Sequence, residues 1–468
     1  MKIRTNTQPQ GSALVVTLLT ALVIGITLAS YLTLVSSQNV STMRSLAWNA
    51  TVPVLEAGVE EALTQIHDRL YNHVGTDITD LSGNGWTLGT DGWYHKTRFT
   101  GNANSYEVAI QPVNPPVIVS VGYVPAPLTP SSQLGMILGG LLPPLPLLNP
   151  PSSPSGNSTT RSISYVSRRI RVNTKGLPRY DKAMAADGQI DLKGNNVQTD
   201  SFQSCNPTYS TNGKYDPAKA RDNGDIATNA GLVSSITAGN ADIKGHVSTG
   251  PGGTVAVGSN GSVGSKAWVE SGKTGIEPGY TSDDMNIEFP DVPVPFTAGY
   301  TTPIGGLVNG VLYDYVLGTG NYKMSSLSGK VLVTGQANLL VTDSVNLGSN
   351  DKIQIVSGAT LKLFVSAPSA SIGGNGVIND GGNALSFQYY GLPSNKSLTY
   401  AGNGTFTGVI YAPEAVFNLG GGGNNTYDFM GGSVTASVSI NGHYNFHYDE
   451  CLKNGPAREY VITAWNEI

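Results

Sequence analysis

The sequence ALVVTLLTALVIGITLASYLTL, from Ala13 to Leu34, is a run of 22 residues that are almost all apolar or small. No charged residue lies between Arg4 and Arg44. A helix of this length extends about 33 Å, enough to cross a hydrocarbon core of about 30 Å. Lys2 and Arg4 precede the run and favour a cytoplasmic N-terminus. We therefore predict a single-pass membrane anchor, with the bulk of the chain on the outer side of an inner membrane.

The helical pattern continues beyond the apolar run as far as about Leu70. Its apolar positions are Leu46, Val54, Val59, Leu63 and Ile66, and its predicted solvated face carries Glu56, Glu60 and Glu61. Pro53 is expected to kink or break this helix. A cleaved secretory signal is the alternative, but its apolar segment would be shorter, about 7–15 residues. We therefore expect one long helix, half in lipid and half amphipathic.

Two stretches of this helix resemble a known family. QGSALVVTLLTALVIGITLASYL, residues 10–32, and VLEAGVEEAL, residues 54–63, are similar to the N-terminal region of type IV pilin-like proteins, particularly the PilX-type minor pilins. The resemblance implies that a prepilin peptidase cuts between Gly11 and Ser12, and that the partners are other pilin or pseudopilin subunits. One position departs from the major-pilin pattern, because Val16 stands where those proteins place a glutamate.

A small sheet is expected after the helix. The β-type segments are Trp93–Phe99, Tyr106–Ile110, Val117–Val124 and Ser162–Val172. The resemblance implies that they form a pilin-like α+β head. A proline-rich insertion, residues 125–160, lies between the last two segments and excludes regular strands there. It is interpreted as a flexible excursion or as an apolar loop that contacts a subunit or membrane.

The rest of the chain alternates short strands with Gly/Asn turns, which is typical of an all-β fold. Nine expected strands are Gln189–Leu192, Ala241–Val247, Thr254–Val257, Lys330–Thr334, Asn338–Val341, Lys352–Val356, Thr360–Val365, Ser369–Ile372 and Gly376–Ile378. Short strands, tight turns and small residues favour a right-handed parallel β-helix, with a β-sandwich as the alternative. TFTGVIYAPEAVFNLGGGG (405–423) and INGHYNFHYDECL (440–452) also resemble solenoid-like domains that follow pilin-type N-termini in some bacterial surface proteins.

The predicted organisation is therefore a basic leader (1–11), a transmembrane and amphipathic helix (12–75), a pilin-like sheet region (76–180) and a β-helix-like domain (181–468). The protein is expected to be mainly β apart from its helix.

Few residues are candidates for chemistry. On a strand, His443, His447 and Asp449 share one face, a weak metal-ligand set that we interpret mainly as a polar exterior face. Tyr444, Phe446 and Tyr448 lie on the opposite face. Cys205 and Cys451 could form a disulfide in an exported compartment, unless a long solenoid holds them too far apart.

The charge composition argues against one class of function, nucleic-acid binding. The chain has 27 Lys and Arg against 32 Asp and Glu, so it lacks the basic excess of a nucleic-acid binder. No catalytic motif and no cofactor motif is recognised. We predict a non-enzymatic, membrane-anchored, pilin-like structural protein of a type IV pilus or pseudopilus that displays a β domain outside the cell for assembly or adhesion. The alternative is an anchored carbohydrate-binding or carbohydrate-active β-helix, with surface polysaccharide as its partner.

Overall fold

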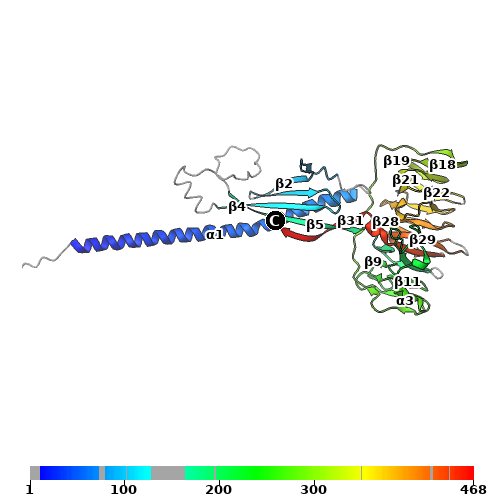
Figure 1. Ribbon diagram of the computed structural model, residues 1–468, viewed down its shortest axis with the longest axis horizontal. Coiled ribbons are helices and arrows are strands. Elements are labelled where there is room, and N and C mark those ends of the chain that lie inside the picture. Colours follow the sequence, from blue (N-terminus) through cyan, green and yellow to red (C-terminus); the bar gives the residue numbers. More distant parts are fainter. Residues whose placement is uncertain are drawn as a thin grey trace, which may run out of the picture. The chain divides into compact units, whose positions relative to one another are not determined.

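The computed structural model describes residues 11–72, 80–101, 103–127, 164–193, 197–348, 350–421, 425–441 and 443–468. The chain is mainly β, with one long apolar N-terminal helix. It divides into two compact units (Figure 1). The smaller comprises residues 1–65, 79–175 and 462–468, and the larger comprises 66–78 and 176–461. Most of the predicted leader, residues 1–10, and the insertion from residue 128 to its end at 160 lie outside the described residues.

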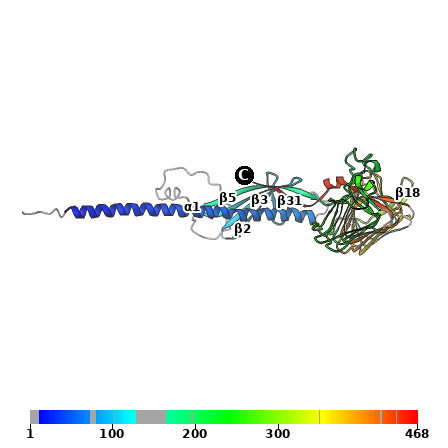
Figure 2. The same ribbon diagram turned by 90° about the horizontal axis from the view of Figure 1, so that it is seen from below.

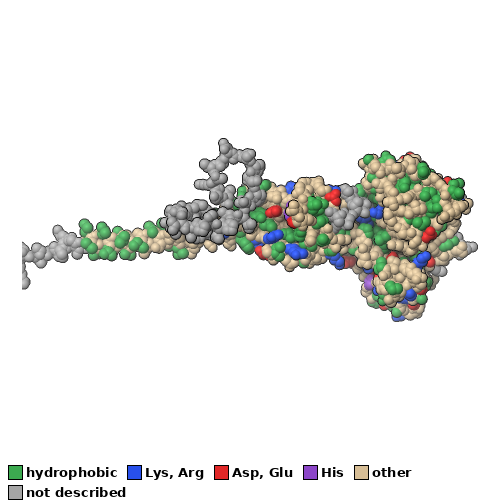
Figure 3. Space-filling view, turned by 45° about the horizontal axis from the view of Figure 1, so that its top comes forward, with side chains coloured by type: hydrophobic (Ala, Val, Ile, Leu, Met, Phe, Trp, Pro, Cys, Tyr) green, Lys and Arg blue, Asp and Glu red, His purple; other side chains and the backbone are tan. Residues whose placement is uncertain are grey.

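Helix α1 runs from Gly11 to Asn72. Its N-terminal half leaves large apolar side chains such as Leu18, Ile24 and Leu32 more than half exposed. Figure 3 shows hydrophobic side chains on the surface of this half of the helix. This helix is long and apolar enough to cross a membrane, and a signal sequence would meet the same criteria of length and composition. The helix continues through Pro53, so the predicted break does not occur there. Val54 and Leu55, directly after the proline, are buried, and their packing offsets the lost backbone hydrogen bond.

The second half of α1 packs against an antiparallel sheet within the smaller unit (Figure 2). Two glycines allow the close approach: Gly58 on the helix faces Ser120 and Tyr106, and Gly122 on the sheet faces the backbone of Thr51 and Leu55. A hydrogen bond from Ser120 Oγ to the Leu55 carbonyl (2.8 Å) joins the two elements. The sheet order is β1 (Thr87–Leu88), β2 (Tyr94–Gly101), β3 (Asn104–Gln111), β4 (Val117–Ala126), β5 (Ser164–Pro178) and β31 (Ala457–Glu467).

Glu61 also ties α1 to this sheet. Its carboxylate lies 2.7 Å from Lys96 Nζ, is paired with Arg98 and accepts a hydrogen bond from the Tyr106 hydroxyl. Burial raises the pKa of Glu61, but the hydrogen bonds from Lys96 and Tyr106 and the two positive charges outweigh burial and lower it. The prediction that Glu61 belongs to a solvated face is therefore wrong, whereas Glu56 and Glu60 are exposed.

The C-terminal strand β31 belongs to the smaller sheet. It lies beside β5, with the Ile468 N–H donating to the Arg169 carbonyl and the Arg179 N–H donating to the Pro456 carbonyl. From the first of these pairs to the second, the residue number rises from 169 to 179 on the β5 side and falls from 468 to 456 on the β31 side, so the two strands are antiparallel. The predicted domain of residues 181–468 is too long at its C-terminal end, because the last strand pairs with a segment nearly 300 residues earlier. In chain order, residues 176–461 of the larger unit are inserted between β5 and β31, two adjacent strands of the smaller sheet.

The larger unit is built around a 20-stranded sheet whose described pairings are all parallel (Figure 1). This pairing differs from the antiparallel pairing of a β-sandwich. Its first half contains β6 (Met184–Ala186), β7 (Ile190–Asp191), β8 (Gln198–Phe202), β9 (Ile226–Thr228), β10 (Ile236–Gly239), β11 (Asp242–Lys244), β12 (Val247–Ser248), β13 (Val255–Val257), β14 (Ser262–Gly264), β15 (Gly275–Ile276) and β16 (Thr281–Ser282). A short helix, α3 (Lys266–Glu270), follows β14.

The second half contains longer strands. They are β19 (Gly320–Leu327), β21 (Gln336–Leu347), β23 (Thr360–Val365), β24 (Ser369–Ile372), β26 (Phe387–Gly391), β27 (Ser397–Tyr400), β28 (Phe406–Leu419), β29 (Tyr427–Ile440) and β30 (Tyr444–Asp449). A separate five-stranded sheet has the order β17 (Ile304–Val308), β18 (Val311–Leu317), β20 (Lys330–Val333), β22 (Lys352–Ile355) and β25 (Val377–Asn379). Each of the nine predicted strands overlaps one or more of these strands.

The two halves meet at a seam, which we define as the pairing of β6–β8 with β29 and β30. Ser433 of β29 pairs with Met184, and His447 of β30 pairs with Asp200. The chain enters the 20-stranded sheet at the seam, and its next strands, as far as β16, lie progressively farther from the seam. It then crosses to β17 in the five-stranded sheet. The strands from β19 to β30 of the 20-stranded sheet lead back to the seam. The crossing segment contacts both halves: Ile287 exchanges hydrogen bonds with Asn229, and Pro290 accepts one from Tyr411.

Stacked aromatic rings fill the core of the second half. The rings of Phe406 and Phe429 lie 4.3 Å apart, and those of Phe429 and Phe446 lie 4.2 Å apart. These residues occupy equivalent positions in β28, β29 and β30, because parallel pairing in register places like side chains above one another. Tyr444 and Tyr448 are also buried, so the predicted apolar face of β30 is the core face.

Candidate functional site

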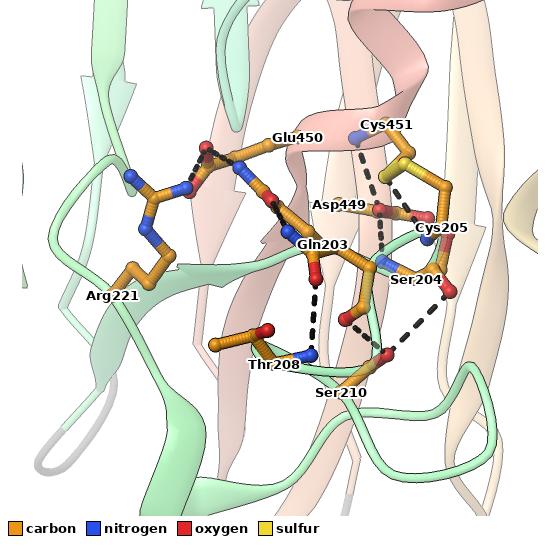
Figure 4. Close-up of a disulfide and its surroundings, with 10 residues drawn as sticks. Gln203, Ser204, Cys205, Thr208, Ser210, Arg221, Asp449, Glu450 and Cys451 are labelled. Atoms are coloured by element: carbon orange, nitrogen blue, oxygen red, sulfur yellow. Dashed lines mark hydrogen bonds and ion pairs between the residues drawn. A yellow bond between two sulfur atoms is a disulfide. The ribbon is translucent and has the colours of Figure 1, made fainter.

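The seam brings the two cysteines together. Cys205 follows β8 and Cys451 follows β30, and these strands pair in parallel, with Phe202 beside Asp449. Their ends therefore leave the sheet at the same place. Cys205 and Cys451 form a disulfide with a Cα–Cα distance of 6.0 Å (Figure 4). The expected obstacle, a long solenoid that holds the two cysteines too far apart, does not arise. The chain enters and leaves the large sheet at its middle, so both cysteines lie there.

Glu450, next to Cys451, is the hub of a polar network across the seam. One carboxylate oxygen accepts hydrogen bonds from Ser201 Oγ (2.8 Å) and Asn223 Nδ2 (2.9 Å). The other accepts from Gln203 Nε2 (3.0 Å) and Arg221 Nη1 (2.8 Å). Its side chain is only 8% exposed. One carboxylate therefore holds the segment Ser201–Asn223 of the first half against the end of the second (Figure 4).

Asp449 has a similar structural role. Its Oδ1 accepts hydrogen bonds from the backbone N–H groups of Ser204 (3.0 Å) and Cys451 (3.1 Å), and so caps the short helix η3 (Glu450–Asn454). Burial raises the pKa of Asp449, and this effect exceeds the opposing effect of its hydrogen bonds. Both bonds need only an acceptor oxygen, so this position does not require a charge.

His447 lies buried between two carboxylates. Its Nδ1 is 2.5 Å from Asp200 Oδ1 and its Nε2 is 3.2 Å from Asp428 Oδ1. The ring stacks on Tyr215 at 3.6 Å, and the Tyr215 hydroxyl donates to Asp200 Oδ2 (2.7 Å). Burial alone lowers the pKa of His447, but the two carboxylates outweigh burial and raise it. The two carboxylates therefore favour the protonated imidazole, which can donate from both nitrogens.

The weak metal-ligand set predicted from sequence is not assembled. Both nitrogens of His447 face carboxylates and Asp449 caps a helix, while His443 lies at the turn before β30. In the part of the chain that the structure describes, no group of three or more His, Cys, Asp or Glu side chains is arranged to hold a metal ion. The interpretation of an exterior polar face is wrong for His447 and Asp449, because both are buried: Tyr215, from the loop after β8, stacks on His447, and the Ser204 N–H of the same loop donates to Asp449.

Gly11 is the first residue of α1 in the described part of the chain. The cut between Gly11 and Ser12 remains a prediction.

The loop after β8 also lines a groove. Tyr215 is fixed by Asp200 and His447, and the neighbouring Lys214 lies at a groove of about 470 Å³. The other walls come from β25, the start of β28 and the Gly/Asn turns that precede them. Sequence reasoning found neither Lys214 nor Glu450, because their partners are remote in the chain and no local pattern marks them.

The Gly/Asn turns beside this groove form a ladder. The Asn375 N–H donates to the Asp351 carbonyl (3.0 Å), and the Asn403 N–H donates to the Gly374 carbonyl (2.9 Å). The Gly374-Asn375 and Asn403-Gly404 turns therefore stack on one another in the larger unit.

Comparison with known proteins adds one match. A family model described as a domain of unknown function, DUF7305, matches residues 310–455. That region runs from the turn before β18 to the end of η3, and so contains the second half of the large sheet, Glu450 and Cys451. No curated protein and no solved structure matches the chain.

Proposed function

We propose that the protein is a non-enzymatic, membrane-anchored, pilin-like structural protein. Its helix sits in the inner membrane or in a type IV pilus or pseudopilus, and its β domain is displayed outside for assembly or adhesion. The observation that carries the proposal is the division of α1: an exposed apolar half is followed, without interruption, by a half that packs on an antiparallel sheet. The N-terminal half has apolar surface to bury in lipid or against other subunits.

The same proposal treats the smaller unit as a pilin-like head and the larger unit as a right-handed β-helix. One helix packed on an antiparallel sheet supports the first assignment. Parallel pairing in register and the stacked Phe406, Phe429 and Phe446 rings support the second. The chain order suits display, because residues 176–461 of the larger unit are connected at both ends to neighbouring strands, β5 and β31, of one sheet.

The test is mass spectrometry of the mature N-terminus, on protein from native cells separated into membrane and sheared surface fractions. We expect a chain that begins at Ser12, is N-methylated and occurs in the sheared fraction. A chain that still begins at Met1 and remains in the membrane fraction would overturn the pilus assignment. A Gly11→Val variant should block the cut, whereas Gly25→Ala is the matched control, because nothing lies within 4 Å of a Cβ there.

A further inference from the structure

The groove beside β25 lies where the five-stranded sheet ends. β25 is the last strand of that sheet, and the start of β28 and Met430 of β29 also line the groove. Its volume of about 470 Å³ is within the range of small-molecule sites. All of its lining residues belong to the larger unit.

Its walls carry amide and hydroxyl groups. Asn403 and Thr405 are exposed at the rim, and Thr407 lies deeper. Among the described residues, no hydrogen bond uses the side chain of Asn403, Thr405 or Thr407. These groups can donate and accept several hydrogen bonds to a ligand. Ile378 and Met430 add apolar surface to the same groove.

Another amide fixes the groove wall. Asn379 Nδ2 donates to the carbonyls of Asn383 (2.7 Å) and Thr407 (3.2 Å), and its Oδ1 accepts from the Gly382 N–H (3.2 Å). This side chain joins the end of β25 to the start of β28, and both segments line the groove. The groups that could bind a ligand therefore lie on a wall that is preorganised in the absence of ligand.

The groove has a positive charge and no acidic residue in its lining. The charge is Lys214, whose stem packs against Gly382: a Cβ there would lie 3.1 Å from Lys214 Cγ and Cε. In the described part of the chain, no ion pair or hydrogen bond occupies the Lys214 ammonium. The adjacent Tyr215 is clamped by Asp200 and His447, which keeps the lysine at the groove.

We propose that this groove binds an acidic oligosaccharide. The Lys214 ammonium pairs with a sugar carboxylate, the free amide and hydroxyls bind ring hydroxyls, and the apolar patch of Ile378 and Met430 covers the C–H face of a sugar ring. The abundance of neutral polar groups around one cation fits a sugar chain better than a phosphate, which would recruit several cations or a helix N-terminus. This proposal names a ligand for the displayed domain, and rests on the proposed function only for its setting.

The test is isothermal titration calorimetry of the full-length chain in detergent micelles with a galacturonic acid hexamer. Maltohexaose is the neutral probe of equal length. The acidic hexamer should bind at least tenfold more tightly than maltohexaose. Lys214→Gln should remove that preference and most of its salt dependence. Lys273→Gln, an exposed lysine outside the groove, is the matched control and should change neither.

A second variant tests the neutral groups. Asn403→Ala with Thr405→Ala should weaken binding of both hexamers by about fivefold or more. Equal binding of the two hexamers, or binding unaffected by Lys214→Gln, would overturn the proposal. Equally tight binding of a glutamate hexapeptide at the same site would also overturn it, in favour of a peptide site. Because this assay is independent of N-terminal processing, its failure is distinguishable from failure of the pilus assignment.

Discussion

Cys205 and Cys451 are 246 positions apart in the sequence, yet their Cα atoms lie 6.0 Å apart. The disulfide joins the end of β8 to the end of β30, across the seam where the first and last parts of the large sheet meet. If the strands followed one another across the sheet in chain order, the first and last strands would lie at opposite ends, and the two cysteines would be separated by the full length of the sheet. The closeness follows from a chain path that begins and ends in the middle of the sheet.

Removing this disulfide should destabilise the larger unit strongly. A loop of 246 residues corresponds to about 5 kcal/mol in the chain-entropy treatment. We expect Cys205→Ser with Cys451→Ser to lower the free energy of unfolding by several kcal/mol, measured by denaturant titration. Dithiothreitol should destabilise the wild type by a similar amount and leave the double variant unchanged. Equal unfolding midpoints for wild type and variant would contradict this prediction.

Glu450→Ala should cost about 3 kcal/mol, because it leaves Arg221 and three polar side chains without their shared acceptor. Glu450→Gln keeps the shape but loses the charge and should be intermediate. Glu414→Ala is the control, since Glu414 makes an exposed ion pair with Lys396 and should cost less than 1 kcal/mol. Denaturant unfolding of the three variants checks the order, and a cost at Glu450 no larger than at Glu414 would refute it.

His447 should make stability depend on pH. Its folded pKa is raised, so its contribution is fully present below the unfolded value of about 6.5 and is lost as pH rises through the folded pKa. We expect His447→Gln to be destabilised by about 3 kcal/mol at pH 5.5, with a smaller difference at pH 9. His246→Gln is the control, because His246 is half exposed and lies 3.5 Å from Asp225. A difference that does not change with pH would exclude the charged state.

Glu61 should give the opposite pH dependence. Its folded pKa is lowered, so its contribution is present above the unfolded value of about 4.3 and is lost as pH falls through the folded pKa. Glu61→Gln should cost about 1 kcal/mol at pH 7, as expected for a partly exposed ion pair, and almost nothing at pH 3. Thermal unfolding against pH measures the effect, and the exposed neighbour Glu60→Gln should show none of it.

Gly122→Ala should loosen the packing of α1 on its sheet. A Cβ at this position would lie 2.7 Å from the Thr51 carbonyl oxygen, a backbone atom that cannot move without shifting the helix. We expect a loss of about 2 kcal/mol, as for other overpacked sites. Gly306→Ala is the control, since its nearest neighbour is a Val316 methyl at 3.8 Å. Limited proteolysis and thermal unfolding would report the difference, and equal behaviour would contradict the tight contact.

Local patterns predicted much of the secondary structure. The strands around Val117–Val124 and Thr360–Val365 were found because each concentrates β-branched and apolar residues between turn residues. The inward face of β30 followed from the alternation of Tyr444, Phe446 and Tyr448. The role of Glu61 was missed, because a solvated and a paired glutamate look the same in a helix whose partner strand is unknown.

The sequence by itself determined the long apolar helix, the mainly β composition and the approximate positions of the strands, because these depend on side chains within a few residues of one another. Only the tertiary structure decided the seam, the return of β31 to the smaller sheet, the Glu450 network and the position of Lys214 at the groove. Each of these joins segments separated by tens to hundreds of residues. Parallel pairing carries no local signal for which strand lies beside which, so that choice is made by the packing of the whole sheet.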